Sequence, residues 1–150
     1  MRCSSFATIA GLIVFVTAAA AQQPSSQSTD QALPSGFETK QLLKSGKTAD
    51  GDALQYPKTE RPEIVAVTGT IQSGGRTPLH QHPIPVFVYV MEGELEVQTE
   101  GKDVRHYKTG DSFIESVNRS HQAFNKSNSA AKILVVFVGE EGKPTTVTGK

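Results

Sequence analysis

The pattern of apolar and polar residues along the chain is that of short β-strands. β-Branched and small residues alternate over Glu63 to Ile71, and apolar and polar residues alternate over Glu94 to Thr99. β-Branched and aromatic residues fill Val86 to Met91. Turns rich in glycine and aspartate separate these runs. No stretch repeats apolar residues at i, i+3, i+4 and i+7 for long enough to predict a helix. The pattern predicts an all-β, antiparallel sandwich or small barrel.

Shorter strands are expected on both sides of these runs. They are predicted at Thr39–Lys44, Leu54–Tyr56, His106–Tyr107, Ser112–Glu115, His121–Asn125 and Lys132–Val138. Further along, the segment TTVTG (residues 145–149) could add an edge strand.

The first 21 residues are predicted to be a secretory signal peptide. Arg2 precedes an uncharged stretch whose apolar centre ends at Ala19-Ala20-Ala21, a small-residue cleavage site. A retained anchor is the alternative, although the apolar centre is shorter than the roughly 20 residues of a membrane span. Cleavage would also remove Cys3, the one cysteine of the chain, which suits an oxidising compartment. We therefore expect a periplasmic or secreted protein with no membrane span after cleavage.

Composition divides the rest of the chain into three parts. Residues 22–36, rich in Gln, Ser and Pro, are predicted to be a flexible leader, residues 37–140 a single barrel domain, and residues 141–150 a loose tail. Without Arg2 the chain has 14 basic residues against 15 acidic ones, since the full sequence has 15 of each. A near-neutral chain without a basic run gives no electrostatic reason to bind nucleic acid or an anionic membrane.

Three of the four histidines are placed for a metal site. His80 and His82 form an H-x-H pair after a glycine-rich turn, and His121 follows 39 residues later. Residues at i and i+2 of a strand face the same way, so both imidazoles can aim at one point, and a histidine from a neighbouring strand can complete the set. Imidazole binds several divalent transition metals, so the metal is not identified. The alternative is that the histidines only pack or form hydrogen bonds.

The surroundings of these histidines resemble the first motif of the cupin superfamily. That motif consists of a glycine, five residues, His-x-His, a glutamate and a closing glycine. Here Gly74, His80, His82 and Gly93 match it, whereas Val86 stands at the position of the glutamate.

The second cupin motif is also recognisable, with substitutions. Gly110 opens it, and residues 116–118, Ser-Val-Asn, stand where the family has Pro-x-Gly. His121 and Asn125 follow at the family's spacing. We expect Asn125 to serve a turn or to contact the substrate.

This resemblance covers roughly residues 62 to 139 and implies a fold and a function. The fold would be an antiparallel double-stranded β-helix, the jelly-roll barrel of a single cupin domain. His80, His82 and His121 would bind one divalent transition metal ion (Fe, Mn, Ni, Cu or Zn). A small-molecule ligand or substrate would bind beside the metal, and the protein would form a homodimer.

Glu115 is the candidate for a fourth ligand in place of the missing glutamate. It lies two residues after Phe113, so the two side chains face the same way along a regular strand. If Phe113 points into the barrel, Glu115 can bind the metal or act as a base beside it. The alternative is a bulge that turns Glu115 outward, toward solvent or Arg119.

Three classes of function fit these features. The first is a metal-dependent enzyme, dioxygenase- or isomerase-like, whose small organic substrate binds directly to the metal. The second is a non-catalytic barrel that holds a small ligand or the metal itself. The third is an assembly role through sheet edges. The remaining histidine, His106, lies among charged residues and is expected to be exposed.

Overall fold

The computed structural model describes residues 35–149, and the chain divides into two units, Met1–Glu38 and Thr39–Lys150. The predicted signal peptide and almost all of the predicted leader lie outside the described residues. Of the first unit, residues 35–38 are described and contain no strand. The second unit contains every described strand. Over residues 35–149 we find no helix, and hence none that could cross a membrane.

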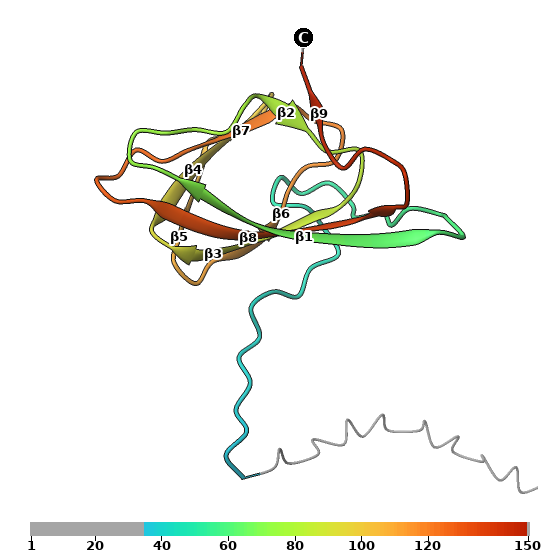
Figure 1. Ribbon diagram of the computed structural model, residues 1–150, viewed down its shortest axis with the longest axis horizontal. Helices are drawn as coiled ribbons and strands as arrows, with labels where there is room; N and C mark the ends of the chain where they lie inside the picture. Colours follow the sequence, from blue (N-terminus) through green and yellow to red (C-terminus); the bar gives the residue numbers. More distant parts are fainter. Residues whose placement is uncertain (1–34, 150) are drawn as a thin grey trace, which may run out of the picture. The chain divides into compact units, whose positions relative to one another are not determined.

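Nine strands form two antiparallel sheets (Figure 1). Their bounds are β1 Pro62–Ile71, β2 His80–Gln81, β3 Val86–Glu92, β4 Glu94–Thr99, β5 Arg105–Lys108, β6 Ser112–Ile114, β7 His121–Phe124, β8 Ala131–Glu140 and β9 Val147–Thr148. The first sheet has the strand order β1-β8-β3-β6, and the second β5-β4-β7-β2-β9.

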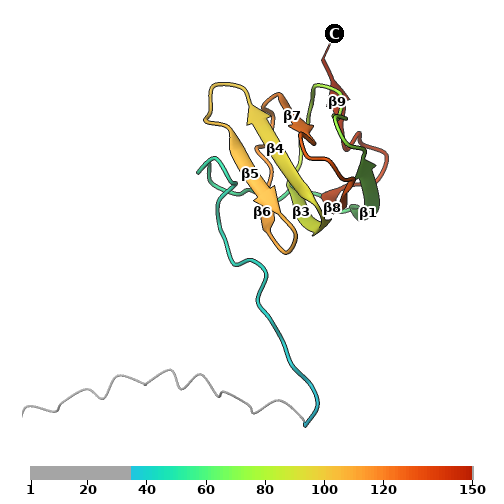
Figure 2. The ribbon, with the colours of Figure 1, turned by 90° about the vertical axis from the view of Figure 1, so that its left-hand side faces the viewer.

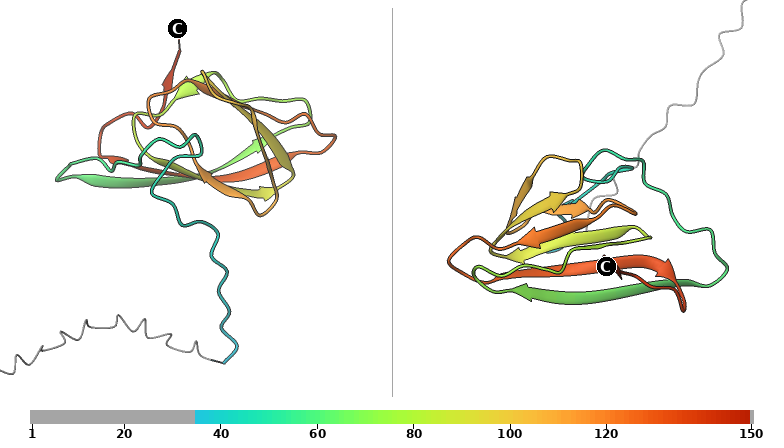
Figure 3. Two further views of the ribbon diagram at one scale, coloured as in Figure 1. Left: turned by 180° about the vertical axis from the view of Figure 1, so that it is seen from behind. Right: turned by 90° about the horizontal axis from the view of Figure 1, so that it is seen from above.

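The long strands β1 and β8 form one wall of the barrel. They pair over their full ten residues, from Pro62 opposite Glu140 to Ile71 opposite Ala131. Both views in Figure 3 show them side by side. The second sheet forms the opposite wall, where β5, β4 and β7 lie next to one another (Figure 2). This is the all-β jelly-roll barrel that the sequence predicts.

The hydrophobic core lies between the two sheets and follows the alternation of the strands. Val86, Val88 and Val90 of β3 point inward and are buried, whereas the residues between them are half-buried on the outer face. Leu95 and Val97 of β4 meet them from the other sheet. Alternating burial of this kind is expected when each sheet has one face on the core.

The two strands predicted before residue 62 are wrong. Residues 39–44 and 54–56 form no strand, and the only pairing in this region is an isolated bridge between Lys47 and Ala53. The segment instead follows the edge of β6. Ser112 Oγ donates to the carbonyl of Leu42, and the Ala49 N–H donates to the carbonyl of Ile114. These two hydrogen bonds hold the segment at β6 without forming a ladder.

Each of the two motifs contains a turn residue with a positive φ, a glycine in the first motif and an asparagine in the second. Gly93 has φ +78°, and a Cβ there would lie 2.8 Å from the Ala130 carbonyl oxygen, so no other residue fits without movement. Asn118, in the second motif, stands where the family has glycine and has φ 54°. Asparagine tolerates this left-handed conformation better than most residues. Its N–H donates to the carbonyl of His82 at 2.7 Å, which ties the turn to the histidine strand.

Candidate metal centre

The three predicted histidines meet at one point inside the barrel. His80 is the first residue of β2, and His82 is the residue directly after that strand. His121 is the first residue of β7, and its backbone pairs with that of His80. One ring nitrogen of each lies within 4.8 Å of those of the other two. His82 and His121 are 2 % exposed, whereas His80 is half-buried. The parity expected from the H-x-H spacing therefore holds.

Each of the three rings has the same hydrogen-bond arrangement. The Nδ1 atoms of His80, His82 and His121 lie 2.7, 2.8 and 2.9 Å from the backbone carbonyl oxygens of Pro78, Thr145 and Arg119, respectively. A carbonyl oxygen only accepts hydrogen bonds, so Nδ1 of each ring carries the proton. In a neutral ring this leaves the lone pair on Nε2. Such a carbonyl partner is typical of histidines that bind metals.

Glu115 points into this cluster and not toward solvent. Its Oε2 lies 3.1 Å from Nε2 of His82 and its Oε1 3.5 Å from Nε2 of His121, and its side chain is only 12 % exposed. Arg119 was the expected partner of an outward-facing Glu115. Its Nη2 atom instead lies 3.5 Å from Asp52. The observed orientation is the one in which Glu115 can serve as a ligand.

The position of Glu115 accounts for the missing motif glutamate. Val86, at the family's glutamate position, is fully buried, and its carbonyl accepts a hydrogen bond from the Glu115 N–H at 3.0 Å. Glu115 directly follows β6, which pairs with β3, so the two residues are neighbours. A carboxylate is present beside the histidines, although it comes from the end of the strand next to the expected one.

The titrating groups of the cluster are strongly coupled. Burial raises the pKa of Glu115, but the neighbouring imidazole rings of His121 and His82 outweigh this and lower it to about 2. Burial lowers the pKa of His121, but the Glu115 carboxylate more than offsets this and raises it. For His80, burial is the largest effect and the pKa is lowered. The carboxylate is thus ionised at neutral pH, and His80 is neutral.

These groups fit a divalent transition metal ion. His121 Nε2 is buried and makes no hydrogen bond to any described residue. An ionised carboxylate and the Nε2 lone pairs of neutral imidazoles repel one another unless a proton or a metal ion lies between them. Two nitrogens each about 2.1 Å from one tetrahedral ion are about 3.4 Å apart. The separations here are at most 4.8 Å, so the rings would move toward one another by up to about 1.4 Å to share an ion.

The interior beneath the cluster is closely packed. The cavity that Glu115 and His121 share with Val97, Tyr107 and Phe113 measures about 10 Å³, which is room for about one water molecule. An organic molecule therefore has no space on this side. The half-buried His80 marks the side on which the cluster reaches solvent.

A buried carboxylate on the floor of this cavity escaped the sequence analysis. Asp50 is 3 % exposed at its side chain, and it accepts hydrogen bonds from Ser116 Oγ at 2.6 Å and from Arg105 Nε at 3.0 Å. Burial raises the pKa of Asp50, but these hydrogen bonds outweigh it, and the pKa lies below its usual value. The bond to Ser116 fixes the residue next to Glu115. In the sequence, Asp50-Gly51 indicates only a turn.

We expect Asp50→Asn to destabilise the protein by about 2 kcal/mol at pH 7, because two hydrogen bonds to a charged group are weakened. A lowered folded-state pKa means that the stabilisation is complete well above the unfolded value of about 3.9 and is lost as the pH falls through the folded value. Urea unfolding should therefore show that the difference in free energy of unfolding between Asp50→Asn and the unaltered chain is smaller at pH 3 than at pH 7. The exposed Asp103→Asn is the control, and an Asp50→Asn difference that is equal at both pH values contradicts this role.

The remaining motif residue, Asn125, braces a turn. It is 1 % exposed, its Nδ2 donates to the carbonyls of Ile71 and Ser129, and its Oδ1 accepts from the N–H and hydroxyl of Ser127. All of its hydrogen-bonding capacity is thus used within the fold. Of its two expected roles, the turn is the one observed.

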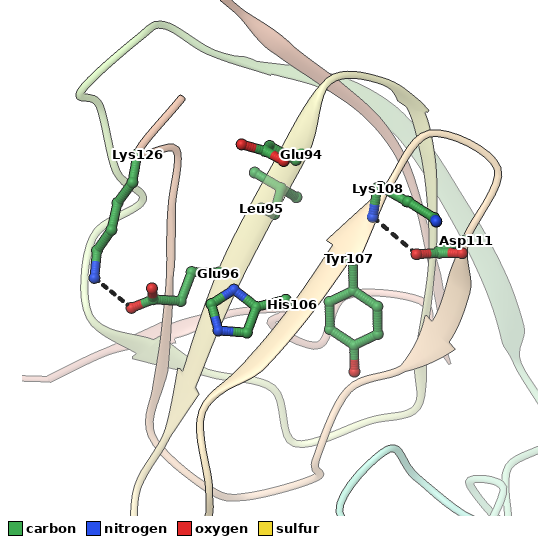
Figure 4. A pocket seen from close by; sticks show the side chains of 8 residues that line it. All are labelled: Glu94, Leu95, Glu96, His106, Tyr107, Lys108, Asp111 and Lys126. Carbon is green, nitrogen blue, oxygen red and sulfur yellow. Dashed lines mark hydrogen bonds and ion pairs between the residues drawn. The ribbon is translucent and has the colours of Figure 1, made fainter. Parts of the chain in front are cut away.

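A larger hollow, of about 550 Å³, lies on the outer side of β4 and β5 (Figure 4). His106 lies there, exposed as expected and apart from the other histidines. Lys126 Nζ lies 2.6 Å from Glu96, and the backbone N–H of Lys108 donates to the Asp111 carboxylate. The hollow therefore adds nothing to the metal centre.

Fold and site together define a small β-barrel protein with a cluster of three histidines and one glutamate. Residues 67–137 match the family model of the cupin domain. The chain belongs to the cupin superfamily, as its two motifs suggest. No curated protein matches the sequence.

Solved structures with the same fold include enzymes of known activity. A DMSP lyase from Ruegeria pomeroyi is 24 % identical with a TM-score of 0.51, over 57 % of this chain and 42 % of the lyase. An S161A mutant of oxalate decarboxylase from Bacillus subtilis, an enzyme with Mn(II) centres, is 20 % identical with a TM-score of 0.51, over 57 % of this chain and 23 % of the enzyme.

A smaller neighbour has a length closer to that of this chain. It is an uncharacterised protein with a double-stranded β-helix domain from Klebsiella pneumoniae, 20 % identical with a TM-score of 0.50, over 65 % of this chain and 90 % of its own. This chain spans less than half of the lyase and less than a quarter of the decarboxylase. At these identities the likeness concerns the fold alone.

Proposed function

We propose that this chain is a metal-binding cupin in which His80, His82 and His121 hold one divalent transition metal ion, with Glu115 as the fourth ligand. The observation that carries the proposal is the shared hydrogen-bond arrangement of the three rings. Each Nδ1 is committed to a backbone carbonyl, so each Nε2 is left for the shared point. His121 Nε2 in particular is buried and makes no hydrogen bond within residues 35–149, and it faces the Glu115 carboxylate at 3.5 Å, where a metal ion could bridge the two groups.

We further propose that the site acts on a small organic molecule bound directly to the metal, in a dioxygenase- or isomerase-like reaction. A divalent ion with three neutral imidazoles and one carboxylate keeps a net positive charge, which favours an anionic substrate group. The metal (Fe, Mn, Ni, Cu or Zn) would supply Lewis acidity or oxygen activation. The histidines orient it, and Glu115 either stays a ligand or accepts a proton from the substrate.

The alternative is a barrel that binds a metal or small ligand without catalysis. The tight packing beneath the cluster favours it, because the cavity there measures about 10 Å³. The two functions differ in whether the metal has an open coordination position on the side of His80.

Spectroscopy of the cobalt-substituted protein tests the enzymatic proposal. We expect one equivalent of Co²⁺ to bind to the metal-free protein and to give visible absorption bands that shift when azide or acetate is added, since both anions can occupy an open position. The His106→Ala variant should behave identically, because His106 is exposed and remote from the cluster. Bands that stay unchanged up to high anion concentrations would show that the metal has no open coordination position. That result would support the barrel that binds a metal without catalysis.

Homodimer formation and export also belong to the proposal. The outer face of the first sheet is apolar along its cross-strand pairs, among them Ile64 with Val138 and Phe87 with Val136 and Ile114. Ile64 is 62 % exposed. A second copy of this chain on that face would cover these side chains. The export signal remains a prediction from residues 1–21.

A further inference from the structure

One of the three histidines is oriented by a distant part of the chain. His80 and His121 use the carbonyls of Pro78 and Arg119, each two residues earlier. Their orientation is therefore built into their own strands. His82 instead uses the carbonyl of Thr145, 63 residues away, with Thr146 Oγ1 at 3.3 Å as a second partner.

The segment that supplies this carbonyl lies across the histidine strand. We call residues 144–149 the strap. Its strand β9 pairs with β2 alone among the described strands, with Thr148 opposite His80 and Val147 opposite Gln81. Figure 1 shows β9 beside β2 at the edge of the second sheet. Both residues of β9 are exposed. Two paired residues with no buried side chain hold a strand weakly, so the strap can detach without disturbing the core.

We propose that the strap completes the metal centre by fixing the ring of His82. Docked, its Thr145 carbonyl keeps the proton on Nδ1 and aims Nε2 at His121 and Glu115. Detached, it leaves a ring free to change its tautomer and its rotation, so the third ligand is no longer preorganised. The proposal rests on the proposed function, because it assigns the strap to the same metal site.

The coupling between strap and metal is reciprocal. If a docked strap raises metal affinity, bound metal stabilises strap docking by the same factor. Loss of an outer partner of a metal-binding histidine typically lowers affinity about 10- to 100-fold. The strap thus gives this site a segment through which its affinity can be changed without touching a ligand.

The test compares the full chain with two variants, a deletion of residues 144–150 and Val147→Pro. Proline removes the N–H at the centre of the strap and disfavours β9, whereas the control Val147→Ala keeps the backbone and shortens only an exposed side chain. We expect the Kd for Co²⁺ to rise about 10- to 100-fold in both variants and to stay unchanged in the control. Circular dichroism and urea unfolding of the metal-free proteins should show that the barrel persists.

A Kd within twofold of that of the full chain in both variants overturns the role of the strap, while metal binding itself stands. If the full chain binds no metal, the proposed function fails and a second measurement decides the strap's role. That measurement is the imidazole ¹⁵N spectrum of the metal-free protein. The full chain should show His82 protonated at Nδ1, and the two variants should show mixed tautomers of His82 with unchanged His80 and His121. A His82 spectrum that is identical in all proteins overturns the inference.

Discussion

Glutamine in place of Glu115 is expected to weaken binding of Co²⁺ or Zn²⁺ by at least about tenfold, as loss of a charged ligand should cost no less than loss of an outer partner. Two effects add. The ion loses a negative charge from a site that is closed to bulk water on this side. The glutamine amide can also donate to Nε2 of His82, 3.1 Å from the present carboxylate oxygen, and so satisfy the metal-free state.

The measurement is a calorimetric or competitive titration of metal-free Glu115→Gln against the unaltered chain. The control is Glu141→Gln, which removes an exposed carboxylate paired only with Arg61 at the surface. Urea unfolding of the metal-free proteins adds a second readout. Because the folded state lowers the pKa of Glu115 to about 2, Glu115→Gln should lose stability at pH 7, and this loss should shrink as the pH falls toward that value. An unchanged Kd would exclude Glu115 from the ligand set and leave a three-histidine site.

Metal is expected to stabilise the unaltered chain and to do nothing for His121→Ala. At a free metal concentration of 1,000 times the Kd, binding to the folded state alone adds about 4 kcal/mol to the free energy of unfolding. His121→Ala removes a ligand whose buried Nε2 makes no other hydrogen bond in the described part of the chain, so the remaining groups bind the metal far more weakly.

Each protein is unfolded with and without metal, and only the difference within each protein is compared. This design matters because His121 is buried, and its removal destabilises the barrel even without metal. The exposed His106→Ala is the matched control and should keep the full metal effect. Equal stabilisation of His121→Ala and the unaltered chain would place the metal elsewhere.

The sequence was informative wherever structure depends on local pattern. β-Branched and alternating residues identified β1, β3 and β4, because each of these strands has one face on the core. The same parity brought His80 and His82 together, since a strand fixes the direction of both side chains. The strands predicted over residues 39–44 and 54–56 failed for the opposite reason: a strand needs a partner, and its availability is decided by the rest of the fold.

The parts of the site that escaped prediction depend on contacts between distant residues. Whether Glu115 turned inward was open because a bulge could have reversed its face. Nothing near His82 in the sequence indicates that Thr145 would hold its ring. Asp50 lies in a turn-like segment, and its burial results from Arg105 and Ser116, which are more than 50 residues away.

The metal content of the protein as isolated, measured by elemental mass spectrometry beside a His82→Ala control, tests the proposed metal centre most directly. We expect close to one equivalent of a single transition metal per chain, and none in the control, because His82 lies beside Glu115 and both other histidines and its removal takes a ligand from their common site. Absence of metal from both proteins, before and after incubation with Fe²⁺, Mn²⁺, Ni²⁺, Cu²⁺ and Zn²⁺, would contradict it. The histidine cluster would then be a hydrogen-bonded part of the barrel and not a metal site.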